Sequence, residues 1–453
     1  MQLYNTLTRT IEPIQADNDK SLGLYACGPT VYDHTHLGHL RKYIMDDVLV
    51  RALRQTGFSV THVQNITDVG HLTSDGDTGE DKLEKGAKKQ GLTAWQVAQQ
   101  FEEFYWQSME AVNVVRPDVS CRATDHIESQ LQLVKTLEKK GFTYVIASDG
   151  VYFDTSLLDD YGKLSGQKRE EKKAGARLDL VEGKRNPTDF AVWKFEREGE
   201  NRAMVWPSPW AERSFPGWHI ECSAMSMQYL GPQFTIHTGG IDHIPVHHTN
   251  EIAQSEAAMG KQPFVRYWVH HNFLQIEGEK MSKSLGNFFT VEDLEKRGIH
   301  PLAFRLLLLG SHYRSELNFT WENALGAQSA YMRLLRTVVE LPAQSERTVL
   351  SQDKLEKVDR YREQFLAALH ADLNTPQALA TMWEVTKSNI PSGDKYDLLL
   401  FFDEVFGLKL SHAEEVLKEI DQLQKSQEPE ITPEIQALLD KRATARANQD
   451  WQT

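Results

Sequence analysis

The residues best suited to chemistry in this sequence are two cysteines, a histidine and a glutamate that are far apart in the chain. His247 and Glu251 are four residues apart in a helical pattern, so both side chains lie on one helix face and could bind one metal ion. Cys27 ends a short apolar stretch, and Cys222 stands in "GWHIECSAM". Two thiolates, an imidazole and a carboxylate suit zinc better than magnesium or calcium.

The same four residues also have a simpler interpretation. A histidine and a glutamate at this spacing are more often part of a solvated helix face, and free cysteines are commonly small residues of the core. With Cys121, the chain has three widely spaced cysteines, which argues against disulfides and predicts reduced thiols. Spacing alone therefore leaves metal binding and core packing as alternatives.

Two further segments could bind phosphate groups. In "HLGH", His36 and His39 flank Gly38 at the start of a predicted helix, whose free N–H groups and dipole favour an anion. In "GEKMSKSLGN", Lys280 and Lys283 lie in a glycine-bounded loop that could close over a polyphosphate. Taken singly, surface histidines and a solvated basic loop are the alternatives, although the five residues KMSKS are more specific.

Other nucleotide and metal motifs find no support. The first strand is not followed by G-x-G-x-x-G, and G-x-x-x-x-G-K-[ST] occurs nowhere. The acidic stretch "DGDTGED" fails the spacing of a calcium loop, so we expect a solvated turn within the insertion at residues 70–81, whose role the sequence leaves open.

The elements that must position these residues alternate between strand and helix. Residues 22–26 and 58–66 predict strands on either side of a helix over 40–53, a unit that begins a parallel sheet. Later, "QFTIHTGGID" predicts a strand ending in a glycine pair, followed by a helix over 247–259. Ligands bind such sheets where strands end and helices begin, which is where Cys27 lies. After Asn287 the pattern is helical almost throughout.

The composition predicts a water-soluble globular protein. It has 453 residues, 40% of them hydrophobic and 25% charged, and no apolar run of the length that spans a bilayer. The N-terminus has neither a basic start nor an apolar signal core, so we expect a cytoplasmic protein with no membrane partner. The net charge of -14 does not favour nucleic acid, but an acidic body can carry one basic face.

The combination of H-x-G-H and KMSKS resembles the class I aminoacyl-tRNA synthetases. More narrowly, the chain resembles the cysteinyl-tRNA synthetase family, whose motifs occur here in the family's order up to about residue 408. The matching segments are "YACGPTVYDHTHLGH", "NITD", "KRNPTDFAVWK", "WPSPW", "PGWHIECSAM", "HTGGIDHIPVHHTNEIAQSEA", "HNFLQIEGEKMSKSLGN" and "DLNTPQALA".

This resemblance implies a role for each candidate residue. It makes four residues the ligands of one zinc ion per chain, namely Cys27, Cys222, His247 and Glu251. It places Trp218 and Thr30 at the amino acid, and it places at ATP the residues His36, His39, Gly239, Gly240, Asp242 and Lys283, with Lys280 assisting. His36, His39, Lys280 and Lys283 would serve catalysis by stabilising charge on phosphate oxygens.

The resemblance also implies the reaction, its partners and the fold. The chain would join L-cysteine to tRNA(Cys) through a cysteinyl-adenylate, with Mg²⁺ accompanying ATP, and would be a monomer. The fold would be α/β, a Rossmann-like parallel-sheet catalytic domain with an inserted subdomain, followed by an α-helical tRNA-binding domain. We expect the catalytic halves at 1–120 and 213–275, an inserted connective subdomain at 121–212, the KMSKS loop and connecting helices at 276–320, an anticodon-binding type of helical bundle at 321–408 and a shortened C-terminal helical segment at 409–453.

Two rival functions and several departures accompany this interpretation. A cysteine-activating ligase of the mycothiol type, which joins cysteine to an amino sugar, would keep the same activation site, and a zinc-bearing RNA-binding protein would keep only the metal. The segment "HIPVHHTNE" differs from the family pattern, and its first residue, His243, is unusual. The family normally continues past "RATARANQDWQT", so we expect a weak dependence on the anticodon.

Overall fold

The computed structural model describes most of the chain. It covers residues 1–18, 20–70, 82–166, 181–281, 285–341, 350–426 and positions 437, 438, 440–442, 444 and 446. The predictions made for Lys283, for residues 71–81 of the acidic insertion and for most of a charged stretch, residues 167–180, lie outside the described residues.

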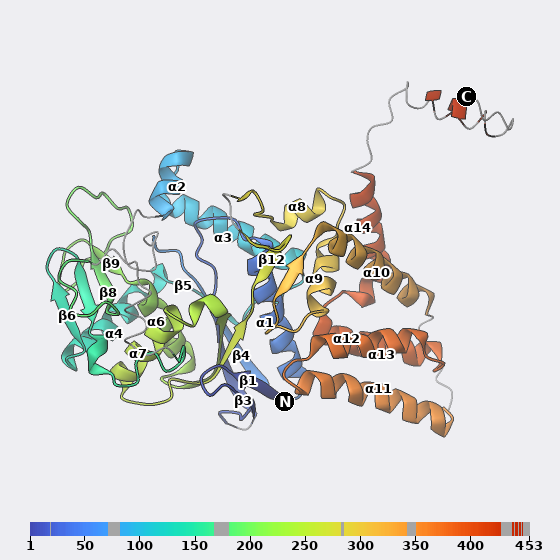
Figure 1. Cartoon of the computed structure of the whole chain (residues 1–453), viewed down its shortest axis with the longest axis horizontal. Coiled ribbons are helices and arrows are strands. Elements are labelled where there is room, and N and C mark those ends of the chain that lie inside the picture. The colour runs from blue at the N-terminus through green and yellow to red at the C-terminus, as the bar shows by residue number, and fades with distance from the viewer. Residues whose placement is uncertain are drawn as a thin grey trace.

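A five-stranded parallel sheet forms the centre of the N-terminal half (Figure 1), with the strand order β11-β10-β3-β4-β5. Every neighbouring pair runs parallel, as the alternation of strand and helix predicts. The strands predicted at 22–26 and 58–66 are confirmed as β3 and β4. The five strands are β3 Ser21–Ala26, β4 Ser59–Ile66, β5 Val119–Arg122, β10 Phe234–Gly240 and β11 Val265–His271.

Successive side chains along β3 pack into different cores on the two faces of this sheet. Leu22 and Leu24 belong to the core that contains α1, whereas Tyr25 and Cys27 belong to the core that contains residues of α6 and α7. This follows from the two-residue period of a strand. Cys27 therefore faces the same side as Cys222 of α6. The three helices are α1 Leu37–Gln55, α6 Trp218–Leu230 and α7 His247–Met259.

A second, antiparallel sheet lies between β5 and α6 in the chain and forms one end of the molecule in Figure 1. Its strand order is β6-β7-β8-β9, and it forms a second core together with α4 and residues of α6 and α7. Strand β9 belongs to this sheet although it follows residue 212, where we expected the inserted subdomain to end. The elements are α4 Ile127–Lys139, β6 Thr143–Ile146, β7 Gly150–Phe153, β8 Phe190–Phe195 and β9 Ser214–Pro216.

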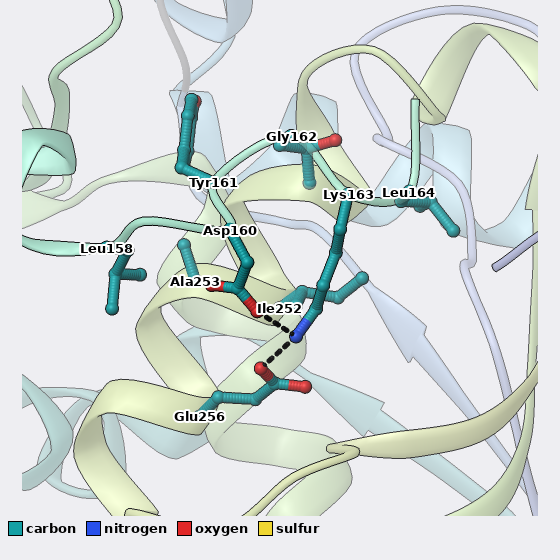
Figure 2. A pocket seen from close by; sticks show the side chains of 10 residues that line it. Leu158, Asp160, Tyr161, Gly162, Lys163, Leu164, Ile252, Ala253 and Glu256 are labelled. Carbon is teal, nitrogen blue, oxygen red and sulfur yellow. Dashed lines mark hydrogen bonds and ion pairs between the residues drawn. The ribbon is translucent and has the colours of Figure 1, made fainter. Parts of the chain in front are cut away.

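Polar contacts fasten a loop of this inserted region to α7 (Figure 2). Lys163 Nζ lies 2.8 Å from Asp160 Oδ2 and also pairs with the carboxylate of Glu256 on α7. Nearby, the hydroxyl of Tyr161 donates a hydrogen bond of 2.7 Å to Asn250 Oδ1. These contacts fix the helix that carries two of the predicted metal ligands against the inserted region.

Most of the described chain after Asn287 is helical, as predicted, but it also contains a short strand. Leu317–Phe319 forms a short strand, β14, which pairs in parallel with β12 and was not anticipated from the sequence. Phe319 is fully buried, and its ring lies 5.2 Å from that of Trp321. Three residues are too few for a strand period to be recognised in a sequence. The small sheet consists of β12 Leu274–Ile276, β13 Glu279–Lys280 and β14.

The helices that follow pack onto the sheet domain through one continuous apolar core. Arg305 of α9 is fully buried, pairs with Asp47 of α1 at 2.5 Å and donates to the backbone oxygen of Val112. These helices are α8 Val291–Glu295, α9 Pro301–Leu309, α10 Trp321–Glu340, α11 Gln352–His370, α12 Thr375–Lys387, α13 Ser392–Phe406 and α14 Ala413–Lys425.

The remaining α-helices and β-strands among the described residues lie in the N-terminal half. They are β1 Gln2–Asn5, β2 Thr10–Pro13, α2 Lys82–Gln90 and α3 Ala94–Ala111. Across the described residues, none of the helices combines the length and the apolar character needed to cross a bilayer.

Candidate active site and metal-binding group

The structure brings the four predicted metal-binding side chains together beyond the end of β3. Each of Cys27, Cys222, His247 and Glu251 contributes one ligand atom, and these atoms all lie within 4.8 Å of one another. None of the four residues is more than 3% exposed. Two sulfurs, one nitrogen and one oxygen at this spacing have the composition of a tetrahedral zinc site.

The carboxylate of Glu251 supports the fit to a cation. Its Oε1 atom is buried and has no hydrogen-bond partner among the described residues, although His247 Nε2 lies 3.0 Å away. Burial alone would raise the pKa of Glu251, but His237 and His247 outweigh it and hold this pKa at about 2. An ionised, incompletely satisfied carboxylate in a buried place favours a bound positive charge.

The pKa values of the two cysteine thiols are shifted in opposite directions. Burial opposes ionisation of Cys27, yet the thiol of Cys222 and the imidazole of His248 hold its pKa well below the usual range. The hydrogen bond with Cys27, reinforced by burial, raises the pKa of Cys222 well above that range. Because a zinc ion binds thiolates, a bound metal ion would take the place of the protons on both sulfurs.

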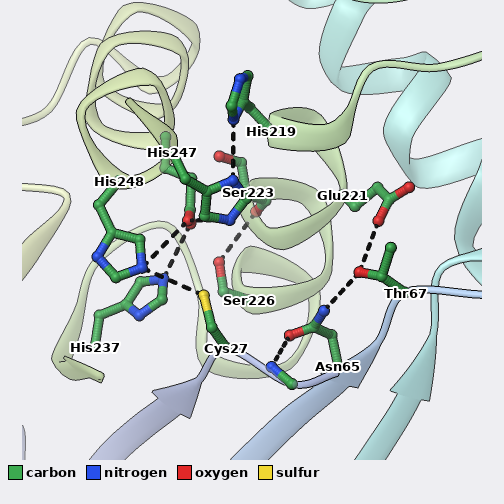
Figure 3. A network of polar contacts seen from close by, with 12 residues as sticks. Cys27, Asn65, Thr67, His219, Glu221, Ser223, Ser226, His237, His247 and His248 are labelled. Carbon is green, nitrogen blue, oxygen red and sulfur yellow. Dashed lines mark hydrogen bonds and ion pairs between the residues drawn. The ribbon is translucent and has the colours of Figure 1, made fainter. Parts of the chain in front are cut away.

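Hydrogen bonds hold the residues of this group in place (Figure 3). Gly28 N donates to Asn65 Oδ1 at 2.8 Å, Asn65 Nδ2 donates to Thr67 Oγ1 at 3.0 Å, and Thr67 Oγ1 donates to Glu221 Oε2 at 3.1 Å. This chain links the residue after Cys27 to the residue before Cys222. A side chain at Gly28 would collide with the backbone, because its Cβ would lie 1.6 Å from Asn65 O.

The imidazole of His247 is oriented from behind by a second histidine. His247 Nδ1 lies 3.0 Å from His219 Nδ1, and this contact leaves Nε2 facing Glu251. Burial lowers the pKa of His247, but the carboxylate of Glu251 outweighs burial and raises it to about 10. The ring of Trp218 lies 4.3 Å from the ring of His247, which places the predicted amino-acid contact beside the metal-binding group.

Two residues of this neighbourhood were missed by sequence reasoning. His237 and His248 are fully buried, and they form a second group of possible ligands with Cys27 and Glu251. His248 directly follows His247 in the sequence, and His237 lies on the strand before the glycine pair. The signal that could have found His237 is strand alternation, since it lies two residues before Gly239 on β10.

The two phosphate-binding signatures also meet at the sheet edge. His36 caps α1 by accepting a hydrogen bond from His39 N at Nδ1, and the two imidazoles stack at 3.5 Å. Phe288, from the segment after KMSKS, lies 4.9 Å from the ring of His36. Met281, within KMSKS, would lie 3.7 Å from a Cβ built on Gly38. The histidines and the KMSKS segment are therefore neighbours.

The other predicted residues surround the same junction. Gly239 and Gly240 end β10, and a Cβ on Gly239 would lie 2.4 Å from His248. Asp242 is exposed, and Thr30 forms an isolated bridge with Thr67. Lys280 is exposed on β13, with Nζ 5.5 Å from the ring of Phe273.

Comparison with known proteins identifies the class to which this fold and site belong. The family model described as tRNA synthetases class I (C) catalytic domain matches residues 13–329, and the chain belongs to this family. Among solved structures, Agrobacterium radiobacter LeuRS in a ternary complex with tRNA and LeuAMS aligns with a TM-score of 0.63, over 89% of this chain and 86% of that one, at 13% identity. Mycobacterium tuberculosis methionyl-tRNA synthetase with methionyl-adenylate aligns with a TM-score of 0.58 at 17% identity, over 88% and 93% of the two chains. At such identities the likeness concerns the fold alone.

Curated relatives narrow the family further. Cysteine–tRNA ligase 1 of Burkholderia lata is 46% identical over all of this chain and 91% of its own length. Cysteine–tRNA ligase of Treponema denticola is 42% identical over all of this chain and 94% of its own length. The predicted membership of the cysteinyl-tRNA synthetase family and the predicted α/β fold with a helical C-terminal region are therefore confirmed.

Proposed function

We propose that this protein ligates L-cysteine to tRNA(Cys) in two steps that use ATP. The observation that carries the proposal is the convergence of four metal-binding side chains beside the two phosphate-binding signatures. The full-length similarity to curated cysteine–tRNA ligases supports it.

In the first step, the carboxylate of cysteine attacks the α-phosphorus of ATP, and pyrophosphate leaves with Mg²⁺. In the second, a ribose hydroxyl at the 3′ end of tRNA attacks the cysteinyl-adenylate and releases AMP. Neither step requires a nucleophile from the protein, so the residues act by alignment and by stabilising negative charge.

The residues proposed to lie near ATP would each contact a different part of the nucleotide. His36 and His39 lie at the N-terminus of α1, where free N–H groups and the helix dipole favour phosphate oxygens. Lys283, assisted by Lys280, would hold the pyrophosphate. Asp242 would bind the ribose hydroxyls, and Gly239 and Gly240 would let the nucleotide approach the backbone.

The four clustered donors would hold one zinc ion per chain, with Cys27, Cys222, His247 and Glu251 as ligands. When bound, zinc would supply a borderline-soft Lewis acid that grips the thiolate of the substrate. Shape alone separates cysteine from serine by only about 1–3 kcal/mol, so a sulfur-seeking site accounts for selectivity. Trp218 and Thr30 would complete the amino-acid pocket.

The remaining parts of the proposal concern organisation. We assign residues 1–120 and 213–275 to the catalytic domain, 121–212 to the inserted subdomain, whose sheet also includes β9, and 276–320 to the KMSKS region. Residues 321–408 would contact the anticodon arm, extended by 409–453. The protein would act as a cytoplasmic monomer.

Aminoacylation of total tRNA with cysteine tests the proposal directly. We expect cysteine to be esterified to tRNA and not to an amino-sugar acceptor offered under the same conditions. Cysteine-dependent ATP–pyrophosphate exchange together with transfer only to the amino sugar would contradict it.

A further inference from the structure

Six donor side chains, rather than four, surround the place where the metal is expected. Cys27 and Glu251 belong to two overlapping groups, one completed by Cys222 and His247 and the other by His237 and His248. We call these the outer set and the inner set. In Figure 3, His237 and His248 lie side by side next to the sulfur of Cys27.

The distances within the inner set match the edges of a tetrahedral site. Cys27 Sγ lies 3.3 Å from His248 Nε2, and His237 Nε2 lies 3.0 Å from Glu251 Oε2. His248 Nε2 lies 3.9 Å from Glu251 Oε1. Zinc bonds of about 2.0–2.3 Å place tetrahedral ligands about 3.3–3.8 Å apart, so small adjustments suffice.

Both inner histidines turn the same ring nitrogen toward this centre. His248 Nδ1 is 2.8 Å from His270 Nε2, and His270 Nδ1 is 2.7 Å from Thr6 Oγ1. His237 Nδ1 lies 3.3 Å from the backbone oxygen of Thr238. When Nδ1 donates to such a partner, Nε2 keeps its lone pair, which is how protein imidazoles are prepared to bind metals.

The carboxylate of Glu251 faces both sets at once. Oε1 lies 3.0 Å from His247 Nε2 in the outer set, whereas Oε2 lies 3.0 Å from His237 Nε2 in the inner set. Because Cys27 and Glu251 serve both sets, one ion can exchange two of its ligands without leaving the other two. The outer set offers two thiolates and is therefore preferred by zinc.

We infer that the inner set, Cys27, His237, His248 and Glu251, is a second position for a zinc-like divalent cation, which the ion takes when Cys222 is not available. This inference extends the outer site of the proposed function, but it concerns the retention of metal and not the reaction. The inner position has one sulfur, two imidazoles and one carboxylate, a donor set that still suits zinc.

Zinc content and zinc K-edge X-ray absorption of the purified full-length protein test this inference. In Cys222→Ser we expect about one zinc ion per chain, bound to one sulfur and two imidazoles. In Cys222→Ser/His248→Ala we expect zinc to be lost. The matched control is Cys222→Ser/His219→Ala, which removes a buried histidine that contacts His247 but belongs to neither donor set, so this variant should retain zinc.

Three results would overturn the inference. They are a zinc-free Cys222→Ser protein, zinc in that variant with a single imidazole, and zinc retained in Cys222→Ser/His248→Ala. If the double variant does not fold, the imidazole count in Cys222→Ser decides alone. A wild-type protein without zinc would instead contradict the outer site, so the two failures are distinguishable.

Discussion

The two sides of the junction between β3 and α1 are built in opposite ways. On one side, the four residues proposed to bind metal lie in the interior, and none of them exceeds 3% exposure. On the other side, His39 and Lys280 are exposed, and "HLGH" is approached by Met281 of KMSKS and by Phe288 of the following segment.

This difference reflects two different tasks. Under the proposed function, the amino-acid site must distinguish cysteine from similar amino acids. A site whose metal ligands are fixed by further contacts can do so without rearranging. Under the same proposed function, triphosphate must enter and pyrophosphate must leave, so the residues proposed to hold it would need to be reachable from solvent. Substitutions on the two sides should therefore act differently, and the following predictions order those effects by size.

The largest effect is expected at the buried side. Replacing Cys222 with serine removes one of the two protein sulfurs that would hold the metal ion. That ion would in turn bind the thiol of the substrate. Because loss of an outer-shell partner already costs about 10–100-fold, loss of a ligand should lower cysteine-dependent ATP–pyrophosphate exchange by more than about 100-fold.

Cys121→Ser is the matched control for this variant. Cys121 is buried but belongs to neither of the two donor groups found among the described residues. Its replacement should leave exchange nearly unchanged. Equal activities of the two variants would show that Cys222 has no special role.

A smaller loss is expected at the open side. Lys283→Ala should slow adenylate formation by about 100-fold, because it removes a positive charge proposed to hold the pyrophosphate. Zinc content should not change. Single-turnover adenylate formation and elemental analysis measure the two quantities.

The control is Lys296→Ala. Lys296 is exposed, directly follows α8, and its Nζ lies 3.7 Å from Glu292 Oε2. Similar rates for both lysine variants would remove Lys283 from the mechanism. Loss of zinc from Lys283→Ala would show that the two sides are not independent.

The buried side should also make stability depend on pH. Burial raises the pKa of Asp68 from 3.8 to about 6, against the opposing hydrogen bonds of Thr124. The folded state thus holds this proton more tightly than the unfolded state does. The free energy of unfolding should therefore be highest in acid and fall by about 2 kcal/mol between about pH 4 and pH 6 through this group.

Asp68→Asn should remove that contribution, as measured by urea unfolding across the same pH range. Glu110→Gln, at an exposed position of α3, should not. An unchanged pH profile in Asp68→Asn would refute the assignment to this carboxyl.

The smallest effect concerns the hydrogen-bonded chain behind the cysteines. Thr67→Val removes the hydroxyl that donates to Glu221 and accepts from Asn65. Two buried polar groups then lose a partner, and the free energy of unfolding should fall by about 1–2 kcal/mol. Thr67→Ser keeps the hydroxyl and should recover most of the loss, so an equal effect of both variants would argue for packing instead.

The sequence predicted the framework of this site well because its signals are local. Short apolar and strand-like runs on either side of a helical pattern identified β3 and β4, and the four-residue spacing of His247 and Glu251 placed both on one face of α7. Their convergence with Cys222 came from the family resemblance and not from spacing. The spacing of these residues in the sequence left core packing as an alternative to metal binding.

The rest depended on contacts between residues that are far apart in the chain. The chain from Gly28 to Glu221 joins three separate segments, and no period in the sequence marks it. His237 reads as one polar residue in a buried strand until the structure places it 3.0 Å from Glu251. The strand at Leu317–Phe319 was missed because it is too short to show alternation.

The most direct test of the account is zinc K-edge X-ray absorption on the full-length protein purified without chelators. The account predicts zinc bound by two sulfurs, together with imidazole nitrogen and carboxylate oxygen. A preparation without zinc, or zinc coordinated by nitrogen and oxygen alone, would contradict it.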